Sequence, residues 1–269
     1  MTHDRAGYFD LGPMDLGENA RRDMVLTLED MGFEVESSYH EAAPGQHEID
    51  FHQCNGLEAA DSLMTFKFAV RTMAKRHGRH ATFMPKPSAG ANGSGLHVNS
   101  ILRDKLGKNL FFDETDERGL SKTAYYFMGG ILKHIQGMTL ITNPLVNSYK
   151  RVVPGYEAPV YVGWATKSKS QIIRIPAARG SKTKIELRSP DSSANPYLVL
   201  AILLAAGLDG IRHQIMPSSC MEENLNQLSQ IEKEERGIQT LPSNLSEAIQ
   251  AFEQDEFVQN VLGEDFSRR

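Results

Sequence analysis

The segment Tyr39-His-Glu-Ala-Ala-Pro-Gly-Gln-His-Glu48 decides the fold, because it predicts the turn of a β-hairpin between two helices. Its Pro44-Gly45 pair is typical of a turn, and the residues on either side favour strands over 33–41 and 46–53. Apolar stripes, each followed by a glycine that can end a helix, predict helices over 15–31 and 58–77.

The hairpin also carries a candidate metal site. A turn centred between Pro44 and Gly45 would place Glu41 directly opposite Glu48. Two carboxylates with Cβ atoms ~5 Å apart repel each other. A divalent cation such as Mg²⁺ would neutralise them; the alternative is a pair of solvated edge-strand glutamates or a slipped register.

The rest of the chain predicts one α+β domain over residues 1–269 without repeats or linkers. Strands are expected over 80–84, 96–102, 160–166, 171–175 and 184–189, helices over 121–139 and 195–215, long loops over 85–95 and 143–159, and a polar helical tail from 218.

Composition indicates an ordinary globular protein: 40% of its 269 residues are hydrophobic, 23% are charged and the net charge is -5. This charge gives no broad basic field for nucleic acid. Two cysteines make no disulfide framework, which favours a reducing cytoplasm. The longest apolar run, 197–208, is short of the ~20 residues that span a bilayer, so no membrane is expected as partner.

Two loops and one strand carry further chemistry. The loop that includes Asn92-Gly-Ser-Gly-Leu-His97 could admit an anion close to its backbone and supply a histidine ligand, although an ordinary long turn is the alternative. The alternation in Lys184-Ile-Glu-Leu-Arg188 predicts a charged strand face, either open to solvent or lining a cleft. Arg151 and Glu157, with Arg174 further on, complete a set that suggests phosphoryl transfer.

This combination resembles the catalytic domain of bacterial type I glutamine synthetases, from Gly7 to about Gly263. The matching motifs are the hairpin segment, Lys86-Pro87 with Asn92 to His97, Asn147-Ser-Tyr-Lys-Arg-Val-Val-Pro-Gly-Tyr-Glu-Ala-Pro159, Arg174-Ile-Pro176, Glu186-Leu-Arg188 and Asn195-Pro-Tyr197.

The resemblance implies a curved antiparallel sheet flanked by helices, and ATP-dependent ligation of ammonia to L-glutamate through γ-glutamyl phosphate. It also implies two sites for Mg²⁺ or Mn²⁺ and a homo-oligomeric ring.

It assigns roles residue by residue. The metal ligands would be Glu41, Glu48, His97 and Glu186. Glutamate would be bound by Asn92, Gly93, Arg151, Glu157 and Arg188. The nucleotide would lie near Tyr8, Glu36, Asn99, Lys169, Arg174 and Lys184. Catalysis would rest on Glu157, Arg151 and Arg174.

The chain also departs from the family pattern. Ile101 replaces a usual serine, and Lys169 and Lys184 replace usual arginines, which keeps the charge but loses the bidentate fork. We expect the chain to lack the family's N-terminal β-grasp domain and C-terminal helical tail, and to turn over little alone. The alternatives are a related ligase that joins glutamate to another amine, and a catalytically silent nucleotide-binding or oligomerisation fragment.

Overall fold

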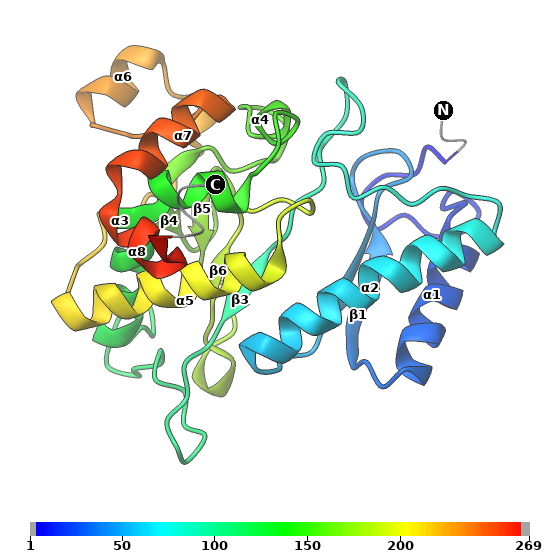
Figure 1. Cartoon of the computed structure of the whole chain (residues 1–269), viewed down its shortest axis with the longest axis horizontal. Helices are drawn as coiled ribbons and strands as arrows, with labels where there is room; N and C mark the ends of the chain where they lie inside the picture. Colours follow the sequence, from blue (N-terminus) through cyan, green and yellow to red (C-terminus); the bar gives the residue numbers. More distant parts are fainter. Residues whose placement is uncertain (1–3, 265–269) are drawn as a thin grey trace. The chain divides into compact units, whose positions relative to one another are not determined.

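The computed structural model describes residues 4–264. These fall into two units, one ending at Ser94 and the other beginning at Gly95, and each is described by itself (Figure 1). Helices and β-sheets occur in both units, so the predicted α+β class is confirmed.

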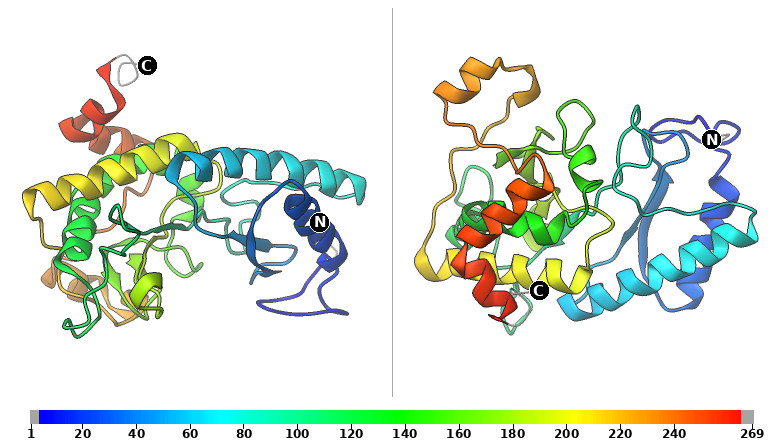
Figure 2. Two further views of the ribbon diagram at one scale, coloured as in Figure 1. Left: turned by 90° about the horizontal axis from the view of Figure 1, so that it is seen from below. Right: turned by 45° about the horizontal axis from the view of Figure 1, so that its top comes forward.

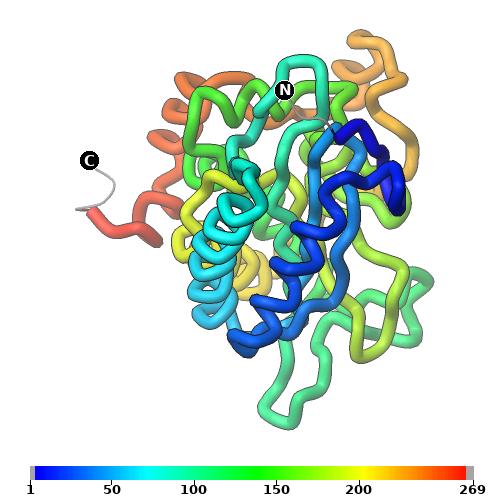
Figure 3. Tube along the Cα trace, turned by 90° about the vertical axis from the view of Figure 1, so that its right-hand side faces the viewer, coloured from blue at the N-terminus to red at the C-terminus, as the bar shows by residue number. Residues whose placement is uncertain are grey.

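The unit that ends at Ser94 is a hairpin with two helices, as predicted. Its elements are α1 (Glu18–Asp30), β1 (Val35–His40), β2 (His47–Phe51) and α2 (Gly56–Arg76). Helix α1 packs against α2, and β1 and β2 run antiparallel side by side (Figure 3). Aromatic contacts join the sheet to the helix, since the Phe51 and Phe66 ring centroids are 5.1 Å apart.

The register of the hairpin differs from the prediction by two residues. Tyr39, and not Glu41, lies opposite Glu48. Because side chains alternate with a period of two, an even shift leaves Glu41 on the same face as Glu48, as a diagonal neighbour.

Local hydrogen bonds explain the shift. The Gln46 amide donates to the Ala43 carbonyl (3.0 Å), so the turn lies where it was predicted. However, the Glu41 amide also donates to the Gln46 carbonyl (2.8 Å). The Ala42 and Ala43 amides donate to the side chains of Glu41 and Gln46 (2.9 and 3.2 Å), which takes both alanines out of the ladder.

The strand predicted over 80–84 does not form. These residues are not part of any strand in the described chain, and the Met84 amide donates to the Thr82 hydroxyl at 3.1 Å. Phe83 instead packs edge-on against Phe66 of α2, with ring centroids 5.8 Å apart. The apolar pattern therefore reflects packing against a helix and not strand pairing.

The second unit is built on a mixed four-stranded sheet. Its strands are β3 (Val98–Ser100), β4 (Tyr161–Ala165), β5 (Gln171–Arg174) and β6 (Ile185–Leu187), in the order β3-β6-β5-β4. The β3–β6 and β6–β5 pairs are antiparallel.

The β4–β5 pair is parallel, where the resemblance implied an antiparallel sheet. The connection 166–170 is much shorter than the crossover of a dozen or more residues usual for parallel strands. The Glu222 carboxylate holds this short connection in place, since it accepts hydrogen bonds from the Thr166 amide and hydroxyl and from the Lys167 amide, at 2.6–2.9 Å.

The helices of this unit pack mainly against one another, α3 against α5 above all (Figure 2). They are α3 (Lys122–Thr142), α4 (Ser148–Arg151), α5 (Pro196–His213), α6 (Gln230–Glu235), α7 (Leu245–Gln254) and α8 (Glu256–Leu262), with short 3₁₀ turns at Gly180–Lys182 and Leu225–Gln227. The α4 turn was not predicted.

Helices α3 and α5 pack closely because Gly130 has no side chain. A Cβ at this position would lie only 2.1 Å from the Ala206 carbonyl oxygen. Helix α5 is long and apolar enough to cross a bilayer, with a mean hydropathy of 1.3. Yet Val199 and Ile202 are fully buried, and its Asp209 bonds to His134 on α3 at 3.0 Å. We therefore interpret α5 as a core helix.

Candidate active site

The paired glutamates of the hairpin lie on one face and interact. Burial, followed by the charge of Asp50 and by a hydrogen bond and charge repulsion from Glu41, raises the pKa of Glu48 to about 8. Tyr39 also hydrogen-bonds to Glu48. The Glu41 and Glu48 carboxyl groups lie within hydrogen-bonding distance of each other, an arrangement that fits a hard divalent cation, which prefers carboxylate oxygens.

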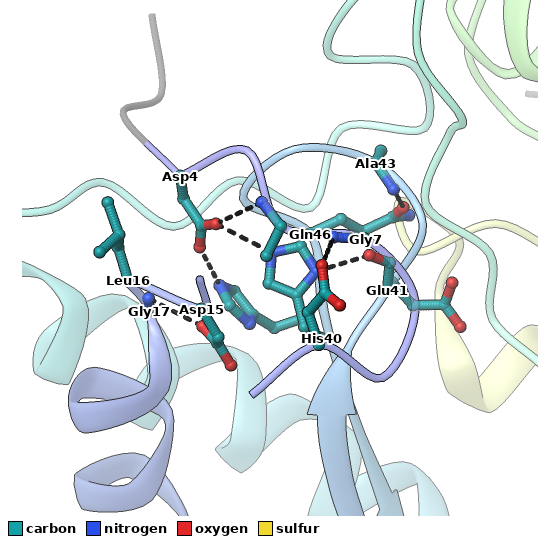
Figure 4. A network of polar contacts seen from close by, with 12 residues as sticks. Asp4, Gly7, Asp15, Leu16, Gly17, His40, Glu41, Ala43 and Gln46 are labelled. Carbon is teal, nitrogen blue, oxygen red and sulfur yellow. Dashed lines mark hydrogen bonds and ion pairs between the residues drawn. The ribbon is translucent and has the colours of Figure 1, made fainter. Parts of the chain in front are cut away.

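A buried polar network braces the backbone of Glu41 (Figure 4). His40 Nδ1 donates to the Glu41 carbonyl at 2.6 Å, and His40 Nε2 lies 3.2 Å from Asp4 Oδ1. Beside them, Arg21 Nη1 contacts Asp15 Oδ2 at 2.6 Å and His47 Nδ1 at 2.8 Å.

Arg21 bears on whether this network is a metal site or structural support. Asp4, Asp15, His40 and His47 bring possible ligand atoms within 4.8 Å of one another. Because the Arg21 guanidinium already bonds two of the four groups, we interpret the network as structural support for the hairpin. Burial and the charge of Arg21 lower the pKa of His47 to about 4, so its ring is neutral. Sequence reasoning missed this network, which spans residues 4 to 47.

Four other predicted residues belong to the same unit. The Gln46 amide group donates to the Gly93 carbonyl at 2.9 Å, which ties the loop containing Asn92 and Gly93 to the hairpin turn. The Tyr8 ring stands edge-on to Tyr39, with centroids 6.0 Å apart. Glu36 is exposed on β1.

Glu186 is the centre of the site in the second unit. It lies on β6 with 3% of its surface exposed. Its Oε2 accepts from Arg174 Nε at 2.5 Å and lies 4.0 Å from Arg188 Nη1, while its Oε1 is 3.4 Å from His97 Nδ1. The charged face predicted for residues 184–188 is therefore largely buried against other charges and is not an open surface.

His97 is held in its neutral form. Burial, with the charges of Arg188, Arg151 and Arg174, lowers the pKa of His97 well below its usual value. Neutral imidazole is the form that binds metal ions. His97 and Glu186 could thus hold a divalent cation, with one nitrogen and one oxygen donor.

Arg151 is the most enclosed cation near the site, with 3% of its surface exposed. Its Nη1 donates to the Ser189 carbonyl at 2.8 Å and its Nη2 to the Arg188 carbonyl at 3.2 Å. Burial, with repulsion from Arg188, lowers the pKa of Arg151 to about 10, so it stays charged at neutral pH. The sequence predicted this arginine but not that backbone carbonyls position it.

The remaining predicted residues of this unit are less buried than Glu186. Glu157 is exposed and has a φ of 54°, a backbone conformation that is uncommon for non-glycine residues. Lys169 and Asn99 are exposed and Lys184 is half-buried. Asn99 lies opposite Glu186 in the β3–β6 ladder.

The structure therefore brings His97, Arg151, Arg174, Glu186 and Arg188 together in one unit, and Glu41 and Glu48 together in the other. It also identifies Asp191 as an unpredicted buried residue. Asp191 pairs with Gly95 across a β-bridge, and its carboxylate accepts from Asn143 at 3.1 Å.

Comparisons with known proteins point to one family. The family model described as glutamine synthetase, catalytic domain, matches residues 1–269. The glutamine synthetase of Clostridium saccharobutylicum is 58% identical over 264 residues, which are 98% of this chain and 59% of the relative. That of Staphylococcus aureus strain MW2 is 52% identical over 97% of this chain and 58% of the relative.

Solved structures share the fold of this chain. One described as "GmaS/ADP complex-Conformation 1" is 35% identical, has a TM-score of 0.88, and is matched over 99% of this chain and 63% of that chain. Another, "Apo GmaS without ligand", has a TM-score of 0.84 at 36% identity. The chain spans about 59% of the length of the curated relatives that it matches. Its sequence and fold show that it belongs to the glutamine synthetase catalytic-domain family.

Proposed function

We propose that this chain, over residues 1–269, supplies the catalytic domain of a glutamate–ammonia ligase that joins ammonia to L-glutamate through γ-glutamyl phosphate at the expense of ATP. The observation that carries the proposal is the buried Glu186 surrounded by His97, Arg174 and Arg188. Such a cluster can bind a cation and several anionic oxygens in one place, which is the main requirement of phosphoryl transfer.

Two divalent cations, Mg²⁺ or Mn²⁺, are proposed as cofactors. Glu41 and Glu48 would hold one, and His97 and Glu186 the other. Bound cations would neutralise phosphate charge during transfer. Arg174, which is paired with Glu186 at 2.5 Å, is proposed to turn to the ATP phosphates when a cation takes its place.

The substrate roles follow from charge and position. Arg151 and Arg188, with the loop residues Asn92 and Gly93, are proposed to bind glutamate. Glu157, exposed on a strained turn, is proposed to accept a proton from ammonium and to shield the acyl phosphate from water.

The nucleotide is proposed to lie near Tyr8, Glu36, Asn99, Lys169 and Lys184. A relative of known structure is described as a complex with ADP, which supports a nucleotide site in this fold. Cys54 and Cys220 are free, and a cytoplasmic location is part of the proposal. Assembly with further copies of the chain is part of the proposal.

The test is the substrate dependence of phosphate release from ATP, because dependence can be measured even when turnover is slow. We expect release to need both glutamate and ammonium, and the Glu157→Gln variant to lose the response to ammonium. The Glu253→Gln variant, at an exposed position on α7, should behave like wild type. Release that is independent of glutamate, or that prefers another amine to ammonium, would contradict the proposal.

A further inference from the structure

Gly95 lies where two site residues meet. A Cβ added to Gly95 would be 2.7 Å from Arg151 Nη2 and 3.3 Å from His97 Nε2. The first distance is shorter than real Cβ contacts allow, so either the backbone of Gly95 or the guanidinium of Arg151 would have to move.

The backbone of Gly95 cannot easily retreat. Gly95 forms an antiparallel bridge with Asp191, and the next amide, that of Leu96, donates to the Pro190 carbonyl at 2.9 Å. Asp191 is fully buried and is itself fixed, because its carboxylate accepts from the Ser193 amide at 2.9 Å. The segment is thus anchored by its pairing with Pro190 and Asp191.

The guanidinium of Arg151 is equally confined. An exposed arginine could swing aside from an added methyl group, but this one is buried and donates to two main-chain carbonyls, those of Ser189 and Arg188. Any displacement of Nη2 lengthens or breaks its bond to the Arg188 carbonyl, whereas the Ser189 carbonyl still accepts from the Asn143 side-chain amide at 3.0 Å.

We propose that Gly95 is a positioning residue: by having no side chain, it lets the Arg151 guanidinium lie beside the His97 ring, held by the Ser189 and Arg188 carbonyls. The consequence for glutamate rests on the proposed function. If Arg151 binds the substrate, Gly95 sets the place at which it does so, and a shift of about 1 Å can cost about 100-fold in a reaction that depends on alignment.

The first test measures coupling between the two residues and needs no activity. Gly95→Ala in the whole chain is expected to lower Tm by about 2–10 °C, the range of an overpacking cost in a chain of this size. In an Arg151→Ala background the same change should cost clearly less, because the 2.7 Å contact with Nη2 is gone and only the milder contact with His97 Nε2 at 3.3 Å remains.

Gly90→Ala is the matched control. Gly90 belongs to the same loop, its φ is not positive and a Cβ added there would have no atom within 4 Å, so its Tm should not change. If Arg151→Ala does not fold, Arg151→Lys serves, since lysine has no Nη2. An equal loss of Tm from Gly95→Ala in both backgrounds would overturn the proposal.

The second test is glutamate binding by calorimetry. Gly95→Ala should weaken binding of L-glutamate by at least about 10-fold while leaving Mg-ATP binding unchanged, and Gly90→Ala should change neither. Wild-type glutamate affinity in Gly95→Ala would overturn the positioning role. If the wild-type chain does not bind glutamate, the proposed function is refuted instead. The comparison of Tm losses in the wild-type and Arg151→Ala backgrounds would still decide whether Gly95 positions Arg151.

Discussion

His134 provides a quantitative test of how the helices of the second unit are held together. It lies on α3 with 4% of its surface exposed, and its two ring nitrogens are each 3.0 Å from a carboxylate oxygen, of Asp209 on α5 and of Asp255 between α7 and α8. Because ionised carboxylates only accept, the imidazolium, with a hydrogen on both nitrogens, is the form of the ring that satisfies both contacts. We predict that His134→Asn destabilises the fold.

The magnitude follows from what the change leaves behind. Removing one partner of a buried ion pair costs about 3–5 kcal/mol. Here the loss is smaller, because Asp209 keeps Lys133 at 3.4 Å and His213 at 2.9 Å, and the Asp255 side chain is 17% exposed. We therefore expect a loss of about 2–4 kcal/mol in the free energy of unfolding.

The effect should depend on pH with a definite sign. Burial alone would lower the pKa of His134, but its bonds to Asp255 and Asp209 outweigh burial and raise that pKa above its usual value. The stabilisation is then complete below the pKa of an unfolded histidine, about 6.5, and is lost as the pH rises through the folded pKa. The difference between wild type and His134→Asn should shrink in alkaline solution.

Urea unfolding of both proteins between pH 6 and pH 9 measures this difference. His213→Asn is the control, because His213 contacts the same Asp209 but its side chain is 66% exposed, and it should cost less than about 1 kcal/mol. The reasoning is refuted if the two variants lose the same stability, or if the His134→Asn loss grows with pH.

Two further predictions concern the same helices. Gly130→Ala should cost about 3 kcal/mol in urea unfolding, because its Cβ would collide with the Ala206 carbonyl, whereas Gly56→Ala, with no atom within 4 Å, should be neutral or slightly stabilising. Asn195→Ala should cost about 1 kcal/mol by the same measurement, because the Asn195 side chain caps α5 by accepting from the Tyr197 amide at 3.0 Å; no measurable loss would contradict this capping role.

The sequence predicts elements well where local chemistry decides them. The Pro44-Gly45 turn and the start of α5 at Asn195-Pro196 follow from turn and capping residues, and the helices on either side of the hairpin follow from their apolar stripes. The predicted register of the hairpin was wrong because the Ala42 and Ala43 amides donate to the side chains of Glu41 and Gln46 and not to the opposite strand. Nothing in a strand pattern indicates such bonds.

Long-range contacts explain the other differences. The parallel β4–β5 pair depends on Glu222, more than 50 positions away from Thr166 and Lys167. The role of Gly95 depends on Arg151 and Asp191, which only the fold brings to it. The residue types of the candidate site could be predicted because metal and phosphate chemistry need them, whereas the carbonyls and glycines that position them could not.

The most direct test of the central proposal is the number of Mn²⁺ ions that the chain binds, measured by calorimetry. The account predicts two ions for wild type, one for Glu41→Ala and one for His97→Ala. The control His80→Ala, at an exposed histidine outside the site, should still bind two. Unchanged Mn²⁺ binding in both Glu41→Ala and His97→Ala would contradict the assignment of the two metal sites, and with it the function proposed for this chain.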